Sequence, residues 1–413
     1  SGTGTLSSAT GNTGVGIGVL GALTSGDNNV AVGLDSLQAN TTGSSNTAIG
    51  QTALAANTTA ANNTAVGMCA MLATTTGGDS TAVGKDSLKT NTTGTDNAAF
   101  GMLALSENTT GVLNAAFGGY ALQDNTTGAG NTAVGISALG NNTTATCNTA
   151  VGFRSLYCNT TGADVTAVGS CALAANTTGA NNVAVGHDAL FTNTDCNNNT
   201  GLGTFALRLN DAGDNTAVGF ASMCATTTGA SNVAVGTYSL DANTTGSNNT
   251  AVGKAALTTN TTGTVSTAVG TEALCGQTTG DNNTGVGYQA LKVSTTGKFN
   301  VAMGNQALVA NTTACYNTAV GWRSMCTNTT GAENVAVGIN SLVANTTASK
   351  NTAVGASAMV ANTTGAENSA VGGEALDANT TGSYNSAFGQ CALGANTTGS
   401  ENTASGQGAL QNN

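Results

Sequence analysis

The residues of this chain whose types could support chemistry are asparagines in a modification pattern, ten cysteines and one histidine. Sixteen times the sequence reads Asn-Thr-Thr, which fits the Asn-x-Ser/Thr pattern of an N-glycosylation acceptor. Modification at these positions would place glycans at regular intervals along the molecule and would keep a weakly charged fibre soluble. The candidate acceptors are Asn40, Asn57, Asn91, Asn108, Asn125, Asn142, Asn159, Asn176, Asn243, Asn260, Asn311, Asn328, Asn345, Asn362, Asn379 and Asn396.

The same stretches allow a purely structural interpretation. Four copies replace the asparagine and still keep the Thr-Thr-Gly that follows it, with Thr74, Thr226, Gln277 and Ser294 at the asparagine position. An asparagine that fits a turn and threonines that fit a ladder would be copied by duplication alone. Glycosylation and turn geometry therefore both remain open as explanations.

Two pairs of cysteines have a common spacing. Cys147 and Cys158 bracket "NTAVGFRSLY", and Cys315 and Cys326 bracket "YNTAVGWRSM". We predict a disulfide within each pair, which would suit an oxidising extracellular environment. The alternative is that they are free cysteines that fill repeated apolar positions. A Cys-x-x-Cys spacing typical of metal sites does not occur.

The sequence contains few residues that could act as catalytic groups. His187 is the only histidine and is followed by Asp188, but the repeat supplies no second partner that would orient the ring, so we expect a solvated side chain. Acidic residues such as Asp27, Asp281 and Glu333 lie in a turn region, where stacked carboxylates would bind calcium only weakly, and the calcium-roll pattern GGxGxD is absent. We expect no enzyme activity, no cofactor and no metal site.

All of these residues lie on a tandem repeat. The glycine that closes "AVG" recurs every 17 residues from Gly16 to Gly203 and again from Gly219 to Gly406, with one shorter interval between the two series. The consensus copy is N-T-A-V-G-x-x-A-L-x-A-N-T-T-G-x-x, whose residues are numbered here as positions 1 to 17. A short fixed period of this kind predicts a solenoid.

The pattern within a copy predicts an all-β fold. Positions 2 and 4 carry Thr, Val or a larger apolar residue, which is the alternation of a strand, and position 9 is Leu or Met. We predict a parallel β-solenoid of the β-roll type with one 17-residue coil per repeat, two strands per coil and about 24 coils. Coils spaced about 4.8 Å apart would form a rod roughly 115 Å long.

Particular positions have predicted places in that coil. Leu at position 9 and the Val side of the strand should fill the core, which would leave Ala at position 3 on an outer strip that packs against another chain or a glycan layer. Position 5 is glycine in every copy, whereas position 15 is alanine at Ala60, Ala145, Ala314 and Ala348. The first corner should therefore demand glycine, through positive φ or close backbone approach, and the second should not.

Composition limits the possible partners. Charged residues make up 7% of the chain, proline is absent, and the net charge is −11 with no basic cluster, so nucleic acid is excluded as a partner. No apolar run is long enough for a membrane span. Because no shift in composition interrupts the array, we expect residues 1–413 to form one continuous solenoid, which is a segment of a longer chain.

The phrase "NTAVGxxAL" resembles the short head repeats of trimeric autotransporter adhesins, which form β-rolls, and similar phrases occur in phage tail-fibre and bacterial surface proteins. This chain departs from those repeats by its longer period and its inserted "ANTTG". The resemblance implies an elongated, surface-exposed β-roll that binds or spaces. We therefore predict an extracellular structural fibre, filament subunit or adhesive stalk that self-associates and carries glycans. The alternative is an ice-binding solenoid with flat Thr and Ala ladders.

Overall fold

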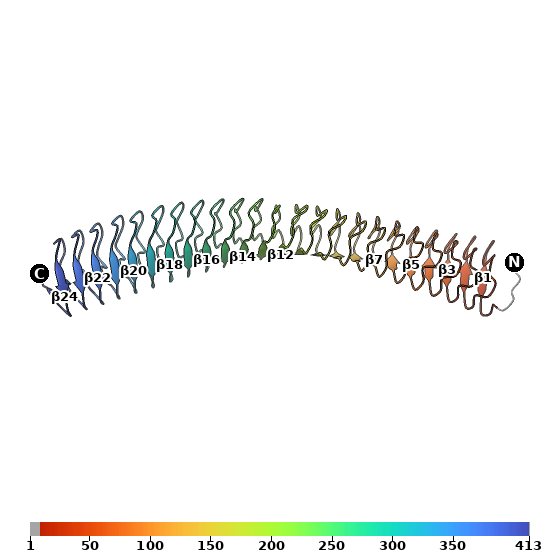
Figure 1. Ribbon diagram of the computed structural model, residues 1–413, viewed down its shortest axis with the longest axis horizontal. Helices are drawn as coiled ribbons and strands as arrows, with labels where there is room; N and C mark the ends of the chain where they lie inside the picture. Colours follow the sequence, from red (N-terminus) through yellow and green to blue (C-terminus); the bar gives the residue numbers. More distant parts are fainter. Residues whose placement is uncertain (1–8, 413) are drawn as a thin grey trace. The chain divides into compact units, whose positions relative to one another are not determined.

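The computed structural model describes residues 9–412 and divides the chain into two compact units, Ser1–Phe205 and Ala206–Asn413. Each unit is a parallel β-solenoid in which every coil contributes one strand of three residues (Figure 1). The predicted fold class is confirmed. Among the described residues there is no helix that is long and apolar enough to cross a membrane.

The strands follow one another at the period of the repeat. The first unit contains β1 (Thr13–Val15), β2 (Val30–Val32), β3 (Thr47–Ile49), β4 (Thr64–Val66), β5 (Thr81–Val83), β6 (Ala98–Phe100), β7 (Ala115–Phe117), β8 (Thr132–Val134), β9 (Thr149–Val151), β10 (Thr166–Val168), β11 (Val183–Val185) and β12 (Thr200–Leu202). The second unit contains β13 (Thr216–Val218), β14 (Val233–Val235), β15 (Thr250–Val252), β16 (Thr267–Val269), β17 (Thr284–Val286), β18 (Val301–Met303), β19 (Thr318–Val320), β20 (Val335–Val337), β21 (Thr352–Val354), β22 (Ser369–Val371), β23 (Ser386–Phe388) and β24 (Thr403–Ser405).

Within each unit, every strand pairs in parallel with the strand of the next coil. In the pairing of β9 with β10, Thr149 lies opposite Thr166 and Val151 opposite Val168, so equivalent positions of the repeat stack directly on one another. The pairing of β15 with β16 repeats this register. Because a slip of one residue would reverse the inward and outward faces, the exact repetition of the sequence holds the register.

The prediction of a second strand in each coil is wrong. Positions 6 to 9 form a turn in which positions 7 and 9 have positive φ, as at Ala255 (55°) and Leu257 (52°). The neighbouring side chains of Ala256 and Leu257 are both fully buried. Adjacent residues of a strand would point to opposite faces, so two consecutive inward side chains require this curled backbone instead.

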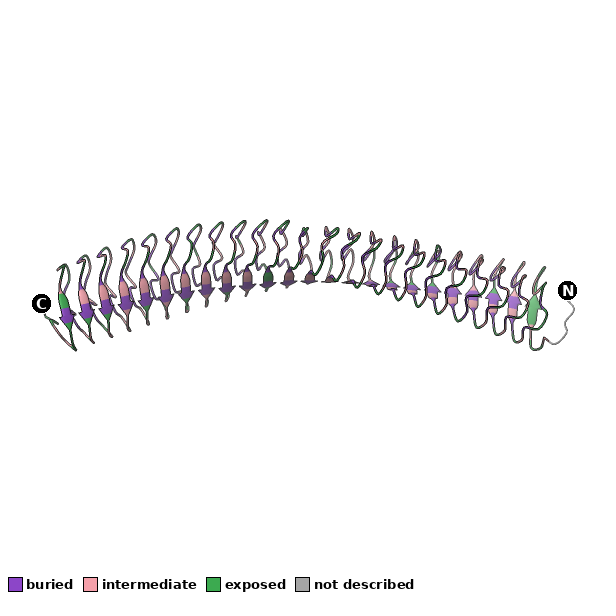
Figure 2. Cartoon of the chain, in the orientation of Figure 1, coloured by how far each residue is buried: buried purple, intermediate pink, exposed green. Residues whose placement is uncertain are grey.

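The predicted assignment of the strand faces is also wrong. Ala251 at position 3 is fully buried, while Thr250 and Val252 on either side of it are only half-buried. An inward alanine is the buried centre of every strand except β1, β12 and β17, which have glycine at that position (Figure 2). The outer strip is therefore formed by positions 2 and 4, and the predicted packing of an alanine strip against another chain is withdrawn.

The reason is the thinness of the coil. At Gly285, which occupies position 3, an added Cβ would lie 3.2 Å from Cγ of Leu274. The position 9 leucine of the preceding coil therefore fills the space behind the strand and leaves room for no more than a methyl group. Valine fits only on the outside. The prediction that position 9 lies in the core is confirmed, since Leu257 and its equivalents are fully buried.

Candidate functional surface

The sixteen candidate glycosylation sites lie inside the coils rather than on the surface. Asn125 is fully buried, and its Nδ2 donates hydrogen bonds to Oδ1 of Asn108 at 2.8 Å and to the carbonyl of Gly128 at 3.0 Å. The other fifteen are buried in the same way, and together they form a ladder of amides along the inside of the second corner. Stacked asparagine ladders of this kind are a known source of stability in parallel β-structures.

This geometry argues against the glycosylation hypothesis. A glycan is attached to Nδ2, which is the atom that donates to the neighbouring coil and to the corner carbonyl. A bulky sugar has no room at a fully buried atom, and the attachment would remove one of its two donor hydrogens. A chain modified at Asn125 could not close this part of the ladder. The structural interpretation of the Asn-Thr-Thr pattern is therefore favoured.

A second ladder of asparagines, at position 1, was not predicted from the sequence. The Oδ1 of Asn114 accepts from the backbone N–H of Asn131 at 3.0 Å, and Nδ2 of Asn131 donates to the carbonyl of Ala145 at 2.9 Å. That carbonyl also accepts from Asn142 of the first ladder at 3.2 Å. The two ladders therefore meet at position 15 and close the second corner from within. The asparagine that begins "NTAVG" in most copies could have indicated this second ladder in the sequence.

The coils that lack a ladder asparagine show what it does. Where Thr74 replaces asparagine, its buried Oγ1 has no hydrogen-bond partner, and neither does Oδ1 of Asn57 in the preceding coil. Thr226 and Ser294 likewise leave their buried hydroxyl oxygens unpaired. By contrast, Gln277 reaches Oδ1 of Asn260 at 3.2 Å and continues the ladder. An amide is needed at this position, and a hydroxyl is too short to replace it.

The predicted disulfides are not formed in the structure, where Cys147, Cys158, Cys315 and Cys326 are free thiols. Cys147 is exposed and Cys158 is half-buried, whereas Cys315 is half-buried and Cys326 is buried. The thiol of Cys315 accepts a hydrogen bond from the backbone N–H of Lys298 at 3.3 Å. The equal spacing in sequence hides a shift of one position within the coil, because Cys147 is at position 17 and Cys315 at position 16.

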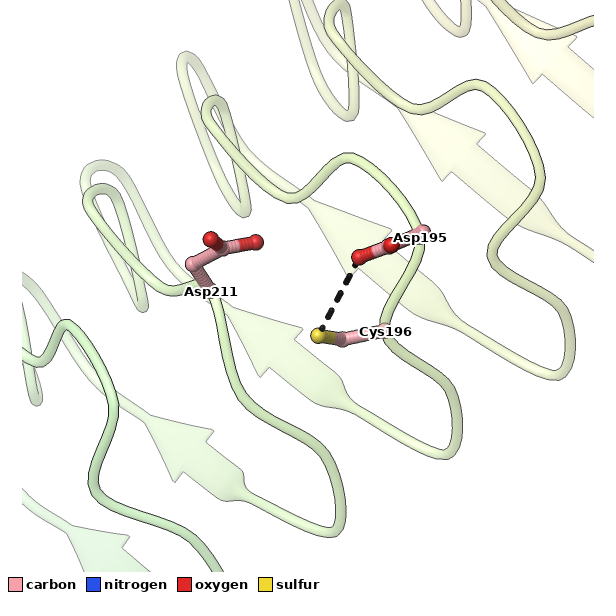
Figure 3. Close-up of side chains that lie close together, drawn as sticks. All are labelled: Asp195, Cys196 and Asp211. Carbon is pink, nitrogen blue, oxygen red and sulfur yellow. Dashed lines mark hydrogen bonds between the residues drawn. The ribbon is translucent and has the colours of Figure 1, made fainter.

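His187 has one aromatic and one acidic neighbour. Its exposed ring lies edge-on to Phe205, with ring centres 5.6 Å apart, and its Nδ1 is 3.7 Å from Oδ2 of Asp188. Asp195 and Cys196 form another polar contact in the first unit, in which the thiol of Cys196 donates to Oδ1 of Asp195 at 3.6 Å (Figure 3). Both contacts join exposed or half-buried groups on neighbouring residues or adjacent coils.

Asp27 and Asp281, two of the acidic residues at the second corner, accept hydrogen bonds from neighbouring coils. Oδ1 of Asp27 accepts from the backbone N–H of Thr10 at 2.6 Å, and Oδ2 of Asp281 accepts from Nζ of Lys298 at 2.6 Å. Partial burial acts to raise the pKa of Asp281, but the hydrogen bonds from Lys298 and Thr264 outweigh it and hold that pKa below its ordinary value. A lysine beside Asp281 makes calcium binding there unfavourable.

Another exposed surface is the outer side of the strands, here called the sheet face and defined as positions 2, 4 and 6 of the coil. Large apolar side chains lie on it and remain more than a third exposed, for example Phe117 (42%) and Trp322 (46%). The other such residues in the first unit are Val15, Ile17, Leu34, Ile49, Met68, Phe100, Met102, Val134, Ile136, Phe153 and Val185. In the second unit they are Phe220, Val233, Val235, Val269, Tyr288, Met303, Val337, Ile339, Val371 and Phe388.

Acidic groups avoid this face. None of the twenty Asp and Glu residues occupies position 2, 4 or 6 of a coil; they lie at positions 7, 10 and 11 and around the second corner. No strand carries a charged residue of either sign, and the charged groups at position 6 are only Lys85 and Lys254. The sheet face therefore carries no acidic group on a molecule of net charge −11, and its large apolar side chains lie beside the threonines of position 2 and two lysines.

The second corner presents a different surface. Thr126 at position 13 donates its hydroxyl to the carbonyl of Thr143 in the next coil at 3.0 Å, so this rank of hydroxyls is used within the ladder. The threonines at position 14, such as Thr144, are exposed. This side of the coil is polar, and the sheet face is apolar.

Comparisons with known proteins bring no assignment, because no protein-family model and no curated protein matches this chain.

Proposed function

We propose that this chain is an extracellular structural element, a fibre or stalk segment in which stacked coils set length and the outward positions set the surface. The observation that supports it is the axial ladder: every strand within a unit pairs in register with its copy one coil away, and the buried asparagines repeat that connection inside. The interior is occupied by Leu, Ala and Asn side chains, so the repetition builds length rather than a pocket.

The resemblance of "NTAVGxxAL" to adhesin heads and tail-fibre repeats supports the same role, and no residue cluster in the described residues favours an enzyme. A glycan coat is not part of this proposal at the sixteen buried asparagines. Any sugars would have to occupy exposed hydroxyls such as those at position 14.

The length-setting role is tested by removing whole coils from the second unit. Deleting the 51 residues from Gly253 to Met303 removes three repeats and rejoins position 4 to position 5. The distance between spin labels at exposed Thr228 and Thr364 should fall by roughly 14 Å, because each coil contributes about 4.8 Å. An unchanged distance, or loss of the fold, would contradict a uniform array.

The extracellular location is tested separately on the cells that produce the protein. Antibodies against the chain should label intact cells or filaments outside them. Labelling that requires permeabilised cells would contradict the location without affecting the solenoid itself.

One observation favours ice binding as a second candidate. Thr132, Thr149 and Thr166 stand in line at position 2 of three consecutive strands, beside a rank of valines at position 4. However, Phe100 and Phe117 interrupt the same rank with stacked rings whose centres are 4.9 Å apart, so the face is not uniformly flat. Thermal hysteresis in a solution of the purified chain would support this candidate, and freezing without hysteresis would dismiss it.

A further inference from the structure

Within residues 9–412, the large apolar side chains of the sheet face stay exposed rather than covered by another part of the chain. Rings and long side chains at positions 4 and 6, such as Phe153 (49%) and Ile339 (48%), remain half exposed. Contiguous apolar surfaces of this kind on a soluble protein mark interaction sites.

Its dimensions match those of a protein interface. Twelve strands about 4.8 Å apart and four residues of width give a strip of roughly 55 Å by 13 Å in one unit, or about 700 Å². A stable interface buries about 800 Å² on each partner, to which the side chains projecting at the edges of the strip would contribute. The face of a single unit is therefore close to sufficient.

The distribution of charge determines which partner fits. All twenty acidic residues lie away from positions 2, 4 and 6, so two copies could meet through this face with their negative charges directed outward. An anionic lipid surface would be repelled by a chain of net charge −11 that has only nine Lys and Arg residues. Electrostatics therefore permit a second copy and oppose a membrane.

The spacing of the side chains selects the same partner. Equivalent residues recur once per coil, so the ridges and furrows of the sheet face have the period of the hydrogen-bonded strands. Only a surface with that same period can interdigitate with it along its whole length, as identical stacked strands do in dry sheet-to-sheet interfaces. The second corner has the same period but is polar, so among the surfaces described above the apolar one that matches is the sheet face of another copy.

We propose that the sheet face packs against the sheet face of a second copy of this chain. The pairing rests on the structural role proposed above, to which it adds the lateral contact between rods. In this pairing, the side chains at positions 4 and 6 select the partner, and those at positions 1, 3, 9 and 12 stabilise the coil.

The test introduces lysine at position 6 of five coils in the full chain. Lys85 and Lys254 already occupy this position in native coils, so the substitution is compatible with the fold. The face variant carries Ile136→Lys, Phe153→Lys, Tyr288→Lys, Trp322→Lys and Ile339→Lys. The control variant carries the same charge at exposed position 14 of the same coils, as Thr144→Lys, Thr161→Lys, Thr296→Lys, Thr330→Lys and Thr347→Lys.

Sedimentation equilibrium over a range of concentrations gives the mass of each protein. The native chain and the control variant should associate, and the face variant should dissociate at least tenfold more readily, with unchanged circular dichroism. A native chain that remains a 39.8 kDa monomer at 100 times the lowest concentration would overturn the proposal, as would equal association of the two variants. Neither result affects the coil-deletion distance, so failure of the pairing and failure of the structural role are distinguishable.

Discussion

The two corners of a coil both carry glycine in most copies, but the backbone uses it differently. At the first corner, Gly253 at position 5 has a φ of 135°. A Cβ added to it would lie only 2.5 Å from the carbonyl oxygen of Gly270 in the next coil. At the second corner, Gly246 also lies close to the next coil, with Gly263 O at 2.4 Å from an added Cβ, but its φ is not in the positive region. The first corner is constrained by conformation and by space, and the second by space alone.

The sequence variation follows this difference. Position 5 is glycine in every copy, whereas position 15 is Ala in four coils and Cys196 in another. The second corner also tolerates a deletion: between Asn210 and Asn215 it has four residues where other coils have five. Asn210 then donates to the carbonyl of Ala212 at 2.7 Å, two residues away instead of three. A corner held by side-chain amides can adjust, and a corner that depends on a glycine backbone cannot.

Matched alanine substitutions would break this comparison most directly. Gly253→Ala should lower the free energy of opening of the coils around it by about 3 kcal/mol. A non-glycine residue is strained at this φ, and its Cβ would collide with the backbone of the next coil. Gly246→Ala should cost less than about 1 kcal/mol, since four coils accept alanine there. Hydrogen exchange of the Gly270 amide, which donates to Val252 at 2.8 Å, reports the opening. Equal losses for the two variants would show that φ is not the distinction.

A repaired asparagine ladder would sharpen the account of the second corner. Thr74→Asn should stabilise its coil by about 1 kcal/mol, because the new amide can donate to the unpaired Oδ1 of Asn57. The control is Thr76→Asn at the exposed position 14 of the same corner, which should change stability little. Hydrogen exchange of neighbouring amides in protein made in bacteria measures both variants. A Thr74→Asn protein no more protected than the control would remove the proposed role of the ladder.

The smallest effect concerns the outer surface of the second corner. The pKa of Asp281 is lower in the folded chain than its ordinary value, so its interaction with Lys298 stabilises the fold above the ordinary aspartate pKa and is lost as the pH falls through the lowered one. The pair is partly exposed, so the loss should be slight. Carboxyl chemical shifts against pH should give an Asp281 pKa below that of a model aspartate, and Lys298→Gln should raise it. An Asp281 pKa unchanged by this substitution would contradict the pairing.

The features that could be predicted from the sequence are those that recur at every copy. The period of 17, the parallel stacking, the buried leucine at position 9 and the special glycine at position 5 all follow from what is constant or apolar in the repeat. The role of the candidate glycosylation sites could not be predicted in this way. The Asn-Thr-Thr pattern serves equally for a glycan acceptor and for an inward amide, and only the side chain's direction distinguishes them.

By itself, the sequence determined that this chain is a stack of identical coils, because identical residues at one period can bury their apolar groups only against one another. Tertiary structure alone decided which side of each strand faces inward. Alternation of Thr, Ala and Val shows that the two faces differ, but not which of them is inside. The leucine at position 9 settles it, because its side chain leaves space for a methyl group only and so excludes valine to the sheet face.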